Sequence, residues 1–346
     1  MTTHALLGTE LPIIQAPMAG VQASALAVAA CGAGALGSLP CAMLGDATLA
    51  DEVATLKAGA NGQPFNLNFF CHQPPAPDAA HEAAWRDALA PYYREFGIDP
   101  AGIAPGPGRS PFDADAATLV EAVRPAFASF HFGLPEAALL ARVKAAGAKV
   151  LASATTVEEA LWLEARGADA VIAQGAEAGG HRGLFLSDDL TTQVGTLALV
   201  PQIVRAVRLP VIAAGGIADA RGVAAALALG AVAAQVGSAY LLYPKATTSA
   251  VHRAALASDA ARHTALTTLF TGRPARAIVN RLMRELGPLN PAAPAFPLAV
   301  AALAPLRARA ERRGSGDFSP LWCGQNASGC RAVPAAELTR ALAGTR

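Results

Sequence analysis

Short apolar runs alternate with segments of helical periodicity along most of this chain, which predicts a repeated unit of one strand followed by one helix. Strands are predicted at residues 11–18, 64–70, 126–131, 149–154, 169–174, 210–215 and 232–236, and another follows the glycine-rich turn at 32–37. Helices are predicted at residues 24–31, 46–57, 135–146, 156–165, 196–207 and 219–229. Eight strands, most of them followed by a helix, favour an α/β fold of the parallel (β/α)8 TIM-barrel type over an open sheet.

Two stretches break this alternation. Residues 71–124 contain an amphipathic patch at 81–96 and a run rich in Pro and Gly, a pattern too irregular for another β/α unit, so we predict an insertion after the third strand. After Tyr243 the chain shows a turn at 271–273, a helix predicted at 275–285 and a proline-rich passage at 288–297. We therefore divide the chain into a barrel domain (1–70 and 125–245), the insertion (71–124) and a C-terminal extension (246–346) that packs on the barrel as a lid.

The amino-acid composition mainly excludes certain classes of partner and site. The chain of 346 residues is 53% hydrophobic and can bury a barrel-sized core. Its formal net charge is +1 without a basic run, so the sequence predicts neither a nucleic-acid nor a membrane partner. Five cysteines without CxxC spacing argue against a zinc site or a disulfide framework. Together with the lack of a secretory signal or a membrane-spanning stretch, they predict a cytoplasmic protein.

Residues 169–183 (DAVIAQGAEAGGHRG) contain the strongest candidate chemistry. A buried strand ends there in a loop that places Gln174, Glu177 and His181 among four glycines. Glycines permit positive φ and let main-chain N–H groups approach a ligand closely. A tight turn with one hydrogen-bonded histidine is the structural alternative, and the loop alone does not decide between the two.

The predicted strand ends favour a flavin. In a (β/α)8 barrel the reactive groups lie at the carboxyl ends of the strands, and the loops after strands seven and eight commonly hold a phosphate. Gly215 and Gly216 follow the seventh predicted strand here, and Gly237 and Ser238 follow the eighth. The other strand ends offer amides, a thioether and an imidazole but few carboxylates, namely Met18, Asn68, His131, Gln174 and Gln235. These groups suit an isoalloxazine ring, and no cluster of His, Asp and Glu indicates a metal.

Several segments also carry a family resemblance. They are QAPMAG at 15–20, NLNFFCH at 66–72, AQGAEAGGHRG at 173–183, AAGGIAD at 213–219, QVGSAYLL at 235–242 and LWCGQ at 321–325. Together and in this order they resemble the nitronate monooxygenase (2-nitropropane dioxygenase) family of the FMN-dependent TIM-barrel superfamily. The resemblance covers most of the chain and implies His181 as the catalytic base. It also implies a bound FMN, held by Met18, Asn68, Gln174, Gly179, Gly216, Gln235, Val236, Gly237 and Ser238.

The activity implied by this resemblance is FMN-dependent oxidation of alkyl nitronates by dioxygen to carbonyl compounds and nitrite. Whether neutral nitroalkanes also react stays open, and so does the oligomeric state. One alternative is an FMN-dependent reductase of the enoyl-reductase type that uses NAD(P)H. Another is a non-catalytic binder of a flavin or phosphate ligand, which would not need His181.

Overall fold

Eight short parallel strands form the central sheet in this computed structural model, which describes residues 4–76, 78–104 and 108–344. The two end strands meet at a parallel bridge between Ile14 and Leu36, where Gln15 N donates to Leu36 O at 3.0 Å. The bridge closes the sheet into an eight-stranded parallel barrel of the TIM type, as the alternation predicts. In spatial order the strands are β1 (Ile13–Gln15), β9 (Ala233–Val236), β8 (Val211–Ala214), β6 (Ala170–Gln174), β5 (Lys149–Ala154), β4 (Phe127–His131), β3 (Phe65–Phe70) and β2 (Gly37–Pro40).

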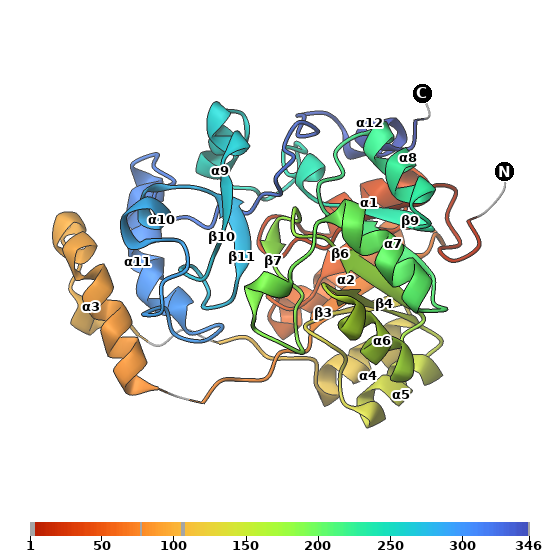
Figure 1. Ribbon diagram of the computed structural model, residues 1–346, viewed down its shortest axis with the longest axis horizontal. Helices are drawn as coiled ribbons and strands as arrows, with labels where there is room; N and C mark the ends of the chain where they lie inside the picture. Colours follow the sequence, from red (N-terminus) through yellow and green to blue (C-terminus); the bar gives the residue numbers. More distant parts are fainter. Residues whose placement is uncertain (1–3, 77, 105–107, 345–346) are drawn as a thin grey trace.

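Helices cover the outside of the barrel (Figure 1). They are α1 (Ser24–Gly32), α2 (Asp46–Gly59), α4 (Ala114–Val123), α5 (Ala137–Ala145), α6 (Val157–Ala165), α7 (Thr196–Ala206), α8 (Ala220–Ala228) and the C-terminal α12 (Ala335–Leu342). Helices α4, α6 and α8 each begin after a residue whose side chain accepts a hydrogen bond from the third N–H along, namely Asp113, Thr156 and Asp219. The sequence predicts no further β/α unit within 71–124, yet α4 packs beside α5 as a barrel helix does.

Side-chain alternation along the strands separates the inside of the barrel from its outside. One end of the interior is an apolar cluster that includes Ile14, Leu36, Phe127, Leu151 and Ile212. The end at the strands' carboxyl termini is polar, where Asn66 and Asn68 of β3 donate to Ser129 Oγ at 2.8 and 3.0 Å. The intervening residues of β3 face the helices in the main core. The barrel thus has an apolar floor and a polar mouth, in which Asn66 and Asn68 bond to Ser129 while Asn66 Oδ1 has no partner among the described residues.

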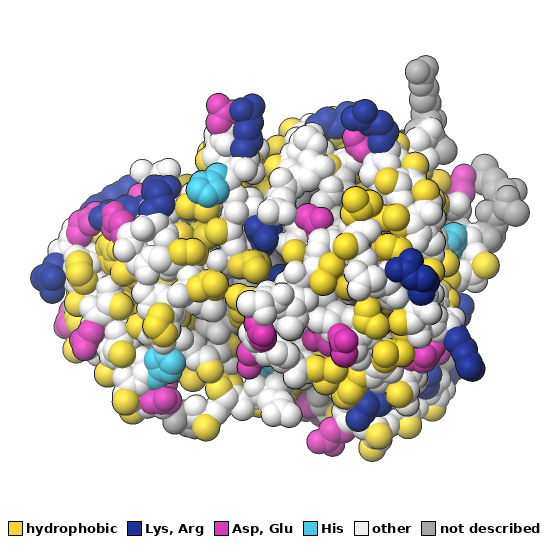
Figure 2. Space-filling view, in the orientation of Figure 1, with side chains coloured by type: hydrophobic (Ala, Val, Ile, Leu, Met, Phe, Trp, Pro, Cys, Tyr) yellow, Lys and Arg dark blue, Asp and Glu magenta, His cyan; other side chains and the backbone are white. Residues whose placement is uncertain are grey.

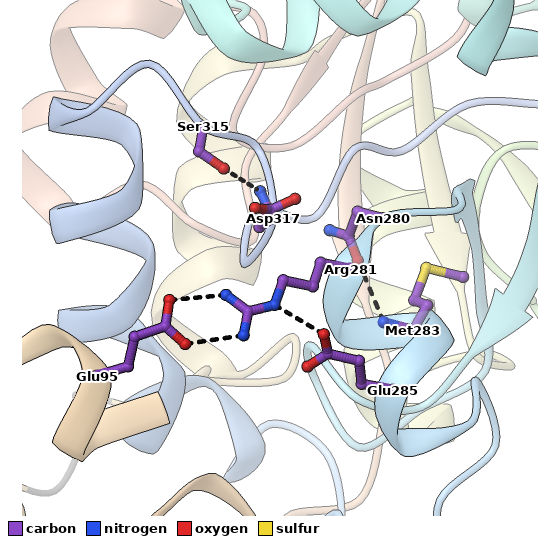
Figure 3. Close-up of polar contacts among 7 residues, drawn as sticks. All are labelled: Glu95, Asn280, Arg281, Met283, Glu285, Ser315 and Asp317. Carbon is purple, nitrogen blue, oxygen red and sulfur yellow. Dashed lines mark hydrogen bonds and ion pairs between the residues drawn. The ribbon is translucent and has the colours of Figure 1, made fainter. Parts of the chain in front are cut away.

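The C-terminal extension adds a second, smaller sheet over the mouth. Strands β10 (Thr264–Thr267) and β11 (Ala275–Ile278) are antiparallel, and β11 also pairs with β7 (Gly180–His181) from the loop after β6. The single helix predicted at 275–285 is therefore wrong. Helix α10 (Arg281–Leu286) begins only after Asn280, whose Oδ1 accepts from Met283 N (Figure 3). Pairing with strands on both sides satisfies the main chain of β11, and this outweighs its local helical pattern.

The insertion packs on the extension through helix α3 (Ala79–Phe96), which lies along α11 (Ala299–Arg312) (Figure 1). Trp85 Nε1 donates to Ala299 O at 3.2 Å, and the hydroxyl of Tyr93 donates to Ala302 O at 2.7 Å. Figure 3 shows a second link, in which Arg281 of α10 donates to both carboxylate oxygens of Glu95 at 2.8 Å. Insertion and extension are thus joined to each other by packing and by an ion pair.

The remaining elements are short. Helix α9 (Ala250–Leu256) precedes β10, and 3-10 turns occupy Pro100–Gly102, Leu190–Thr192, Ser238–Tyr240 and Asp259–Arg262.

Figure 2 shows side chains of both charge signs interspersed over one face. Across the described residues, no helix combines the length and apolarity that crossing a bilayer requires. Residues 1–3, 77, 105–107, 345 and 346 belong to the predicted ranges 1–70, 71–124 and 246–346 but lie outside the described part. The division at those boundaries stays a prediction.

We expect Trp85→Ala to loosen α3 from α11, because it removes a fully buried ring and its hydrogen bond. Truncations of this kind destabilise by about 3–5 kcal/mol. Limited proteolysis should then cut within residues 79–96 faster than in the wild-type protein. Arg86→Ala is the control, since this neighbouring side chain is partly exposed and its hydrogen bond to Pro100 O is long, at 3.4 Å. Equal protection of α3 in the two variants would contradict the packing role of Trp85.

Candidate functional site

A cavity of about 340 Å³ lies at the carboxyl ends of the barrel strands, between them and the extension. Its walls come from the loops after β1, β6, β8 and β9 on the barrel side. The opposite wall includes residues of β7 and α11 and the segment 318–322. Barrel enzymes hold their reactive groups at this end of the strands.

Most of the residues predicted from the sequence line this cavity. These are His181 and the predicted cofactor residues Met18, Asn68, Gln174, Gly179, Gly216, Gln235, Gly237 and Ser238. Val236 is the exception, because its side chain is buried on the outer side of the barrel with Ile13 and Tyr240. Successive residues of a strand face opposite sides, so Gln235 pointing inward forces Val236 outward.

Three glycines of the wall present main-chain N–H groups that have no protein acceptor within the described part of the chain. They are Gly179, Gly216 and Gly237, whereas Gly215 continues the pairing of β8 with β9. Gly215 and Gly216 have φ values of 118° and 70°, and a Cβ on Gly215 would lie 2.7 Å from Thr196 Oγ1. Only glycine suits such a position. Several unpartnered N–H groups around one space form an anion-binding site.

The carboxylate of Glu177 holds the neighbouring helix start rather than entering the cavity as a free charge. It accepts from Thr196 N and Thr196 Oγ1, both at 2.8 Å. The hydroxyl of Thr196 also lies 3.0 Å from Gly215 O. The glycine loop after β8 is therefore locked to the loop after β6.

His181 lies on β7 with its Nε2 2.9 Å from Thr271 Oγ1. That hydroxyl also lies 3.4 Å from Arg273 O, to which it can donate its proton. It then accepts from Nε2–H of His181, and in a neutral imidazole this leaves Nδ1 as the proton acceptor. No hydrogen bond to Nδ1 occurs among the described residues.

Burial lowers the pKa of His181 well below its ordinary value of 6.5. The charges of His131, Arg109, Arg273 and His72 act in the same direction. An aromatic wall contributes to this environment, with the rings of Phe296 and Trp322 both centred 5.4 Å from the imidazole. The imidazole is therefore neutral near pH 7 and able to accept a proton.

Gln174 lines the cavity but uses its amide to hold the loop that follows it. Its Nε2 donates to His181 O at 3.0 Å, and its Oε1 accepts from Gly183 N at 2.8 Å. His131 Nε2 lies 3.2 Å from the same His181 oxygen. Two side chains at strand ends thus fix the main chain that presents the imidazole.

Several residues around His181 are not predicted from the sequence. The pattern indicates only a turn at 271–273, and Phe296 falls in the proline-rich passage. Phe132 and Arg109 also reach this region, from the loops after β4 and β3. The segment LWCGQ, which carries part of the family resemblance, contains Trp322. No local feature of the sequence predicts that Thr271 lies beside His181. Their assembly depends on docking of the extension onto the barrel.

Fold and site together define a barrel enzyme in which glycine N–H groups that can bind an anion lie beside a neutral, partly buried imidazole. The model of the family described as nitronate monooxygenase matches residues 2–344. The chain belongs to the nitronate monooxygenase family, whose members are typically flavin-dependent.

Individual relatives agree with this assignment over nearly the whole chain. The nitronate monooxygenase of Paraburkholderia phytofirmans is 45% identical over 97% of this chain and 92% of its own length. The nitronate monooxygenase of Pseudomonas aeruginosa is 44% identical over 97% of this chain and 96% of its own length. The solved structure of nitroalkane oxidase from Streptomyces ansochromogenes aligns with a TM-score of 0.87 at 39% identity, covering 97% of this chain and 95% of that one.

Acidification should destabilise the fold through His131. Burial lowers the pKa of this imidazole from 6.5 to about 4. Between these values the unfolded chain binds more protons than the native one, so the free energy of unfolding falls as pH drops from 6.5 to 4. The full effect is about 3 kcal/mol. His131→Gln cannot titrate and should reduce this dependence, to which His181 and His252, whose pKa values burial also lowers, still contribute.

Urea titrations at pH 7.5 and pH 5 measure the change. The exposed His263, replaced by Gln, is the matched control and should keep the wild-type difference between the two pH values. The quantity to compare is that difference rather than the absolute stability, because His131→Gln also alters hydrogen bonds to Ser153 and His181. A wild-type pH difference in His131→Gln would contradict the assignment.

Proposed function

We propose that this chain binds FMN in the cavity and oxidises alkyl nitronates with dioxygen, giving a carbonyl compound and nitrite. The observation that carries the proposal is the neutral imidazole of His181 beside the cradle of unpartnered main-chain N–H groups. The names of the relatives support the same substrate class, since they include nitronate monooxygenases and a nitroalkane oxidase.

The residues of the cavity fit FMN. The N–H groups of Gly179, Gly216 and Gly237 would hold its phosphate. Gln235 Oε1 is buried and has no hydrogen-bond partner among the described residues, so it would accept a hydrogen bond from the flavin ring. When bound, FMN would supply the redox chemistry, taking electrons from the substrate and passing them to dioxygen.

The side chains around His181 would position the substrate and move one proton. The rings of Phe70, Phe132, Phe296 and Trp322 surround the imidazole, which is partly buried, and reduce its contact with water. A neutral nitroalkane would lose its α-proton to Nδ1 of His181, because Nε2 already holds a proton for Thr271. A nitronate is already the anion and would need only to be bound.

The cysteines support a cytoplasmic location as part of this proposal. All five are free, and three of them are buried in the structure. Burial raises the pKa of Cys31 to about 11 and that of Cys41 to about 12, so these thiols stay protonated and unreactive. A set of unpaired thiols is typical of a reducing compartment.

We expect Gly237→Val to weaken FMN binding by about tenfold or more, because the side chain would enter the space of the phosphate. The fold should tolerate it, since a Cβ there lies 3.5 Å from Ala16 Cβ and 3.6 Å from Met18 Sδ, which are ordinary contacts. Fluorescence titration of the apoprotein with FMN measures the affinity, and a thermal melt measures the stability.

Gly32→Val is the matched control, since a Cβ on Gly32 meets no atom within 4 Å and this helix end lies away from the cavity. Acid precipitation of the wild-type holoprotein should release FMN. Release of FAD, or unchanged FMN affinity in Gly237→Val, would contradict the cofactor assignment.

His181→Asn should lower turnover of neutral nitroalkanes by about 10²–10⁴-fold, the usual contribution of a positioned general base. Nitronate oxidation should fall much less, because no proton has to be removed. Steady-state rates with both substrate forms, at flavin content matched to wild type, measure the difference. An equal small loss with both forms removes His181 from the role of base. Rapid anaerobic reduction of the flavin by NADPH would favour the reductase alternative instead.

A further inference from the structure

One cation at the cavity, Arg109, has no part in the chemistry proposed above. It lies between the 3-10 turn at Pro100–Gly102 and α4, and its guanidinium carbon is 5.9 Å from the centre of the Phe296 ring. The same ring lies 5.4 Å from the imidazole of His181. Arg109 and His181 therefore both line the cavity and both lie beside the ring of Phe296.

Arg109 makes no ion pair within the described part of the chain, and its buried Nε has no hydrogen-bond partner there. A half-buried guanidinium without a counter-charge is energetically unfavourable unless another anion binds it. The other cations of this region are better satisfied. Arg307 pairs with Glu311 at 2.8 Å, and Arg273, whose Nε is also unpartnered, donates to Leu184 O.

The main chain of Arg109 is fixed close to the site. His72 Nε2 lies 3.1 Å from Arg109 O, and the His72 ring packs edge-on against Phe296 with centroids 4.9 Å apart. Arg109 also lines a cleft of about 910 Å³ between barrel helices and the α3–α11 unit. Arg109 thus belongs to the lining of both the cleft and the cavity.

We propose that Arg109 binds the two nitronate oxygens of the substrate and thereby selects the anion over the neutral nitroalkane. This inference rests on the proposed function. A guanidinium presents a planar pair of donors that matches two oxygens on one atom, as in its pairing with carboxylates. His181 is neutral and supplies no such charge. With a nitroalkane, the proton passes from the α-carbon to His181 Nδ1, and Arg109 then pairs with the anion that remains.

The test uses Arg109→Met and the charge-conserving Arg109→Lys in the flavin-loaded protein. For ethylnitronate, KM should rise about 10- to 100-fold in Arg109→Met, the range of a lost charge-assisted hydrogen bond. The kcat should stay within about twofold, because binding is lost equally in ground and transition states. KM for neutral nitroethane should be unchanged, and Arg109→Lys should recover part of the loss. Arg86→Met, in the cleft but outside the cavity, is the charge control.

A second measurement does not depend on turnover. Nitrate is a planar anion with its oxygens on nitrogen, and calorimetric titration should show that it binds wild type and Arg86→Met but not Arg109→Met. If Arg109→Met loses nitrate binding but the wild-type protein turns over no nitronate, the anion site is upheld and the proposed function is refuted. Unchanged nitronate KM in Arg109→Met, or nitrate binding that is the same in all variants or absent from wild type, would overturn the role of Arg109.

Discussion

The main-chain oxygen of His181 is the point on which the site depends. It accepts hydrogen bonds from the side chains of Gln174 and His131, so the ends of two barrel strands hold the glycine-rich loop from one side. On the other side the same loop pairs as β7 with β11 of the extension. The fully buried Arg182 adds bonds to Gln174 O and Gly175 O. Together these bonds offset the entropy lost in ordering so many glycines.

The electrostatic character of the cavity depends on which groups the nearby carboxylates bind. Glu177 is occupied by Thr196, and Glu159 accepts from Thr155 N and Phe185 N, both at 2.6 Å. Their charges act on neighbouring arginines, with both carboxylates raising the pKa of Arg182, and neither is among the groups that shift the pKa of His181. The cavity therefore combines a neutral base with an excess of positive character, which suits an anionic substrate and an anionic cofactor group.

The barrel and its polar mouth could be predicted from the sequence because both depend on local periodicity. Because side chains alternate along a strand, Asn66 and Asn68 must share one face of β3, which is the inner face. The same alternation turns Val236 away from the cavity that Gln235 lines. Residues 275–278 were harder, since only pairing with β7 and β10 makes them a strand. Arg109, Thr271 and Phe296 sit on connections far apart in sequence, and no local pattern encodes the packing that gathers them.

The origin of each functional group has a consequence for how such a protein can change. The main chain of His181 is held by the barrel strands and its imidazole by Thr271, whereas the guanidinium of Arg109 belongs to a connection outside the repeating β/α pattern. Loops of this kind tolerate replacement far better than strands do. Related proteins could therefore differ in substrate preference through substitutions in that connection alone, while the residues that transfer the proton stayed the same.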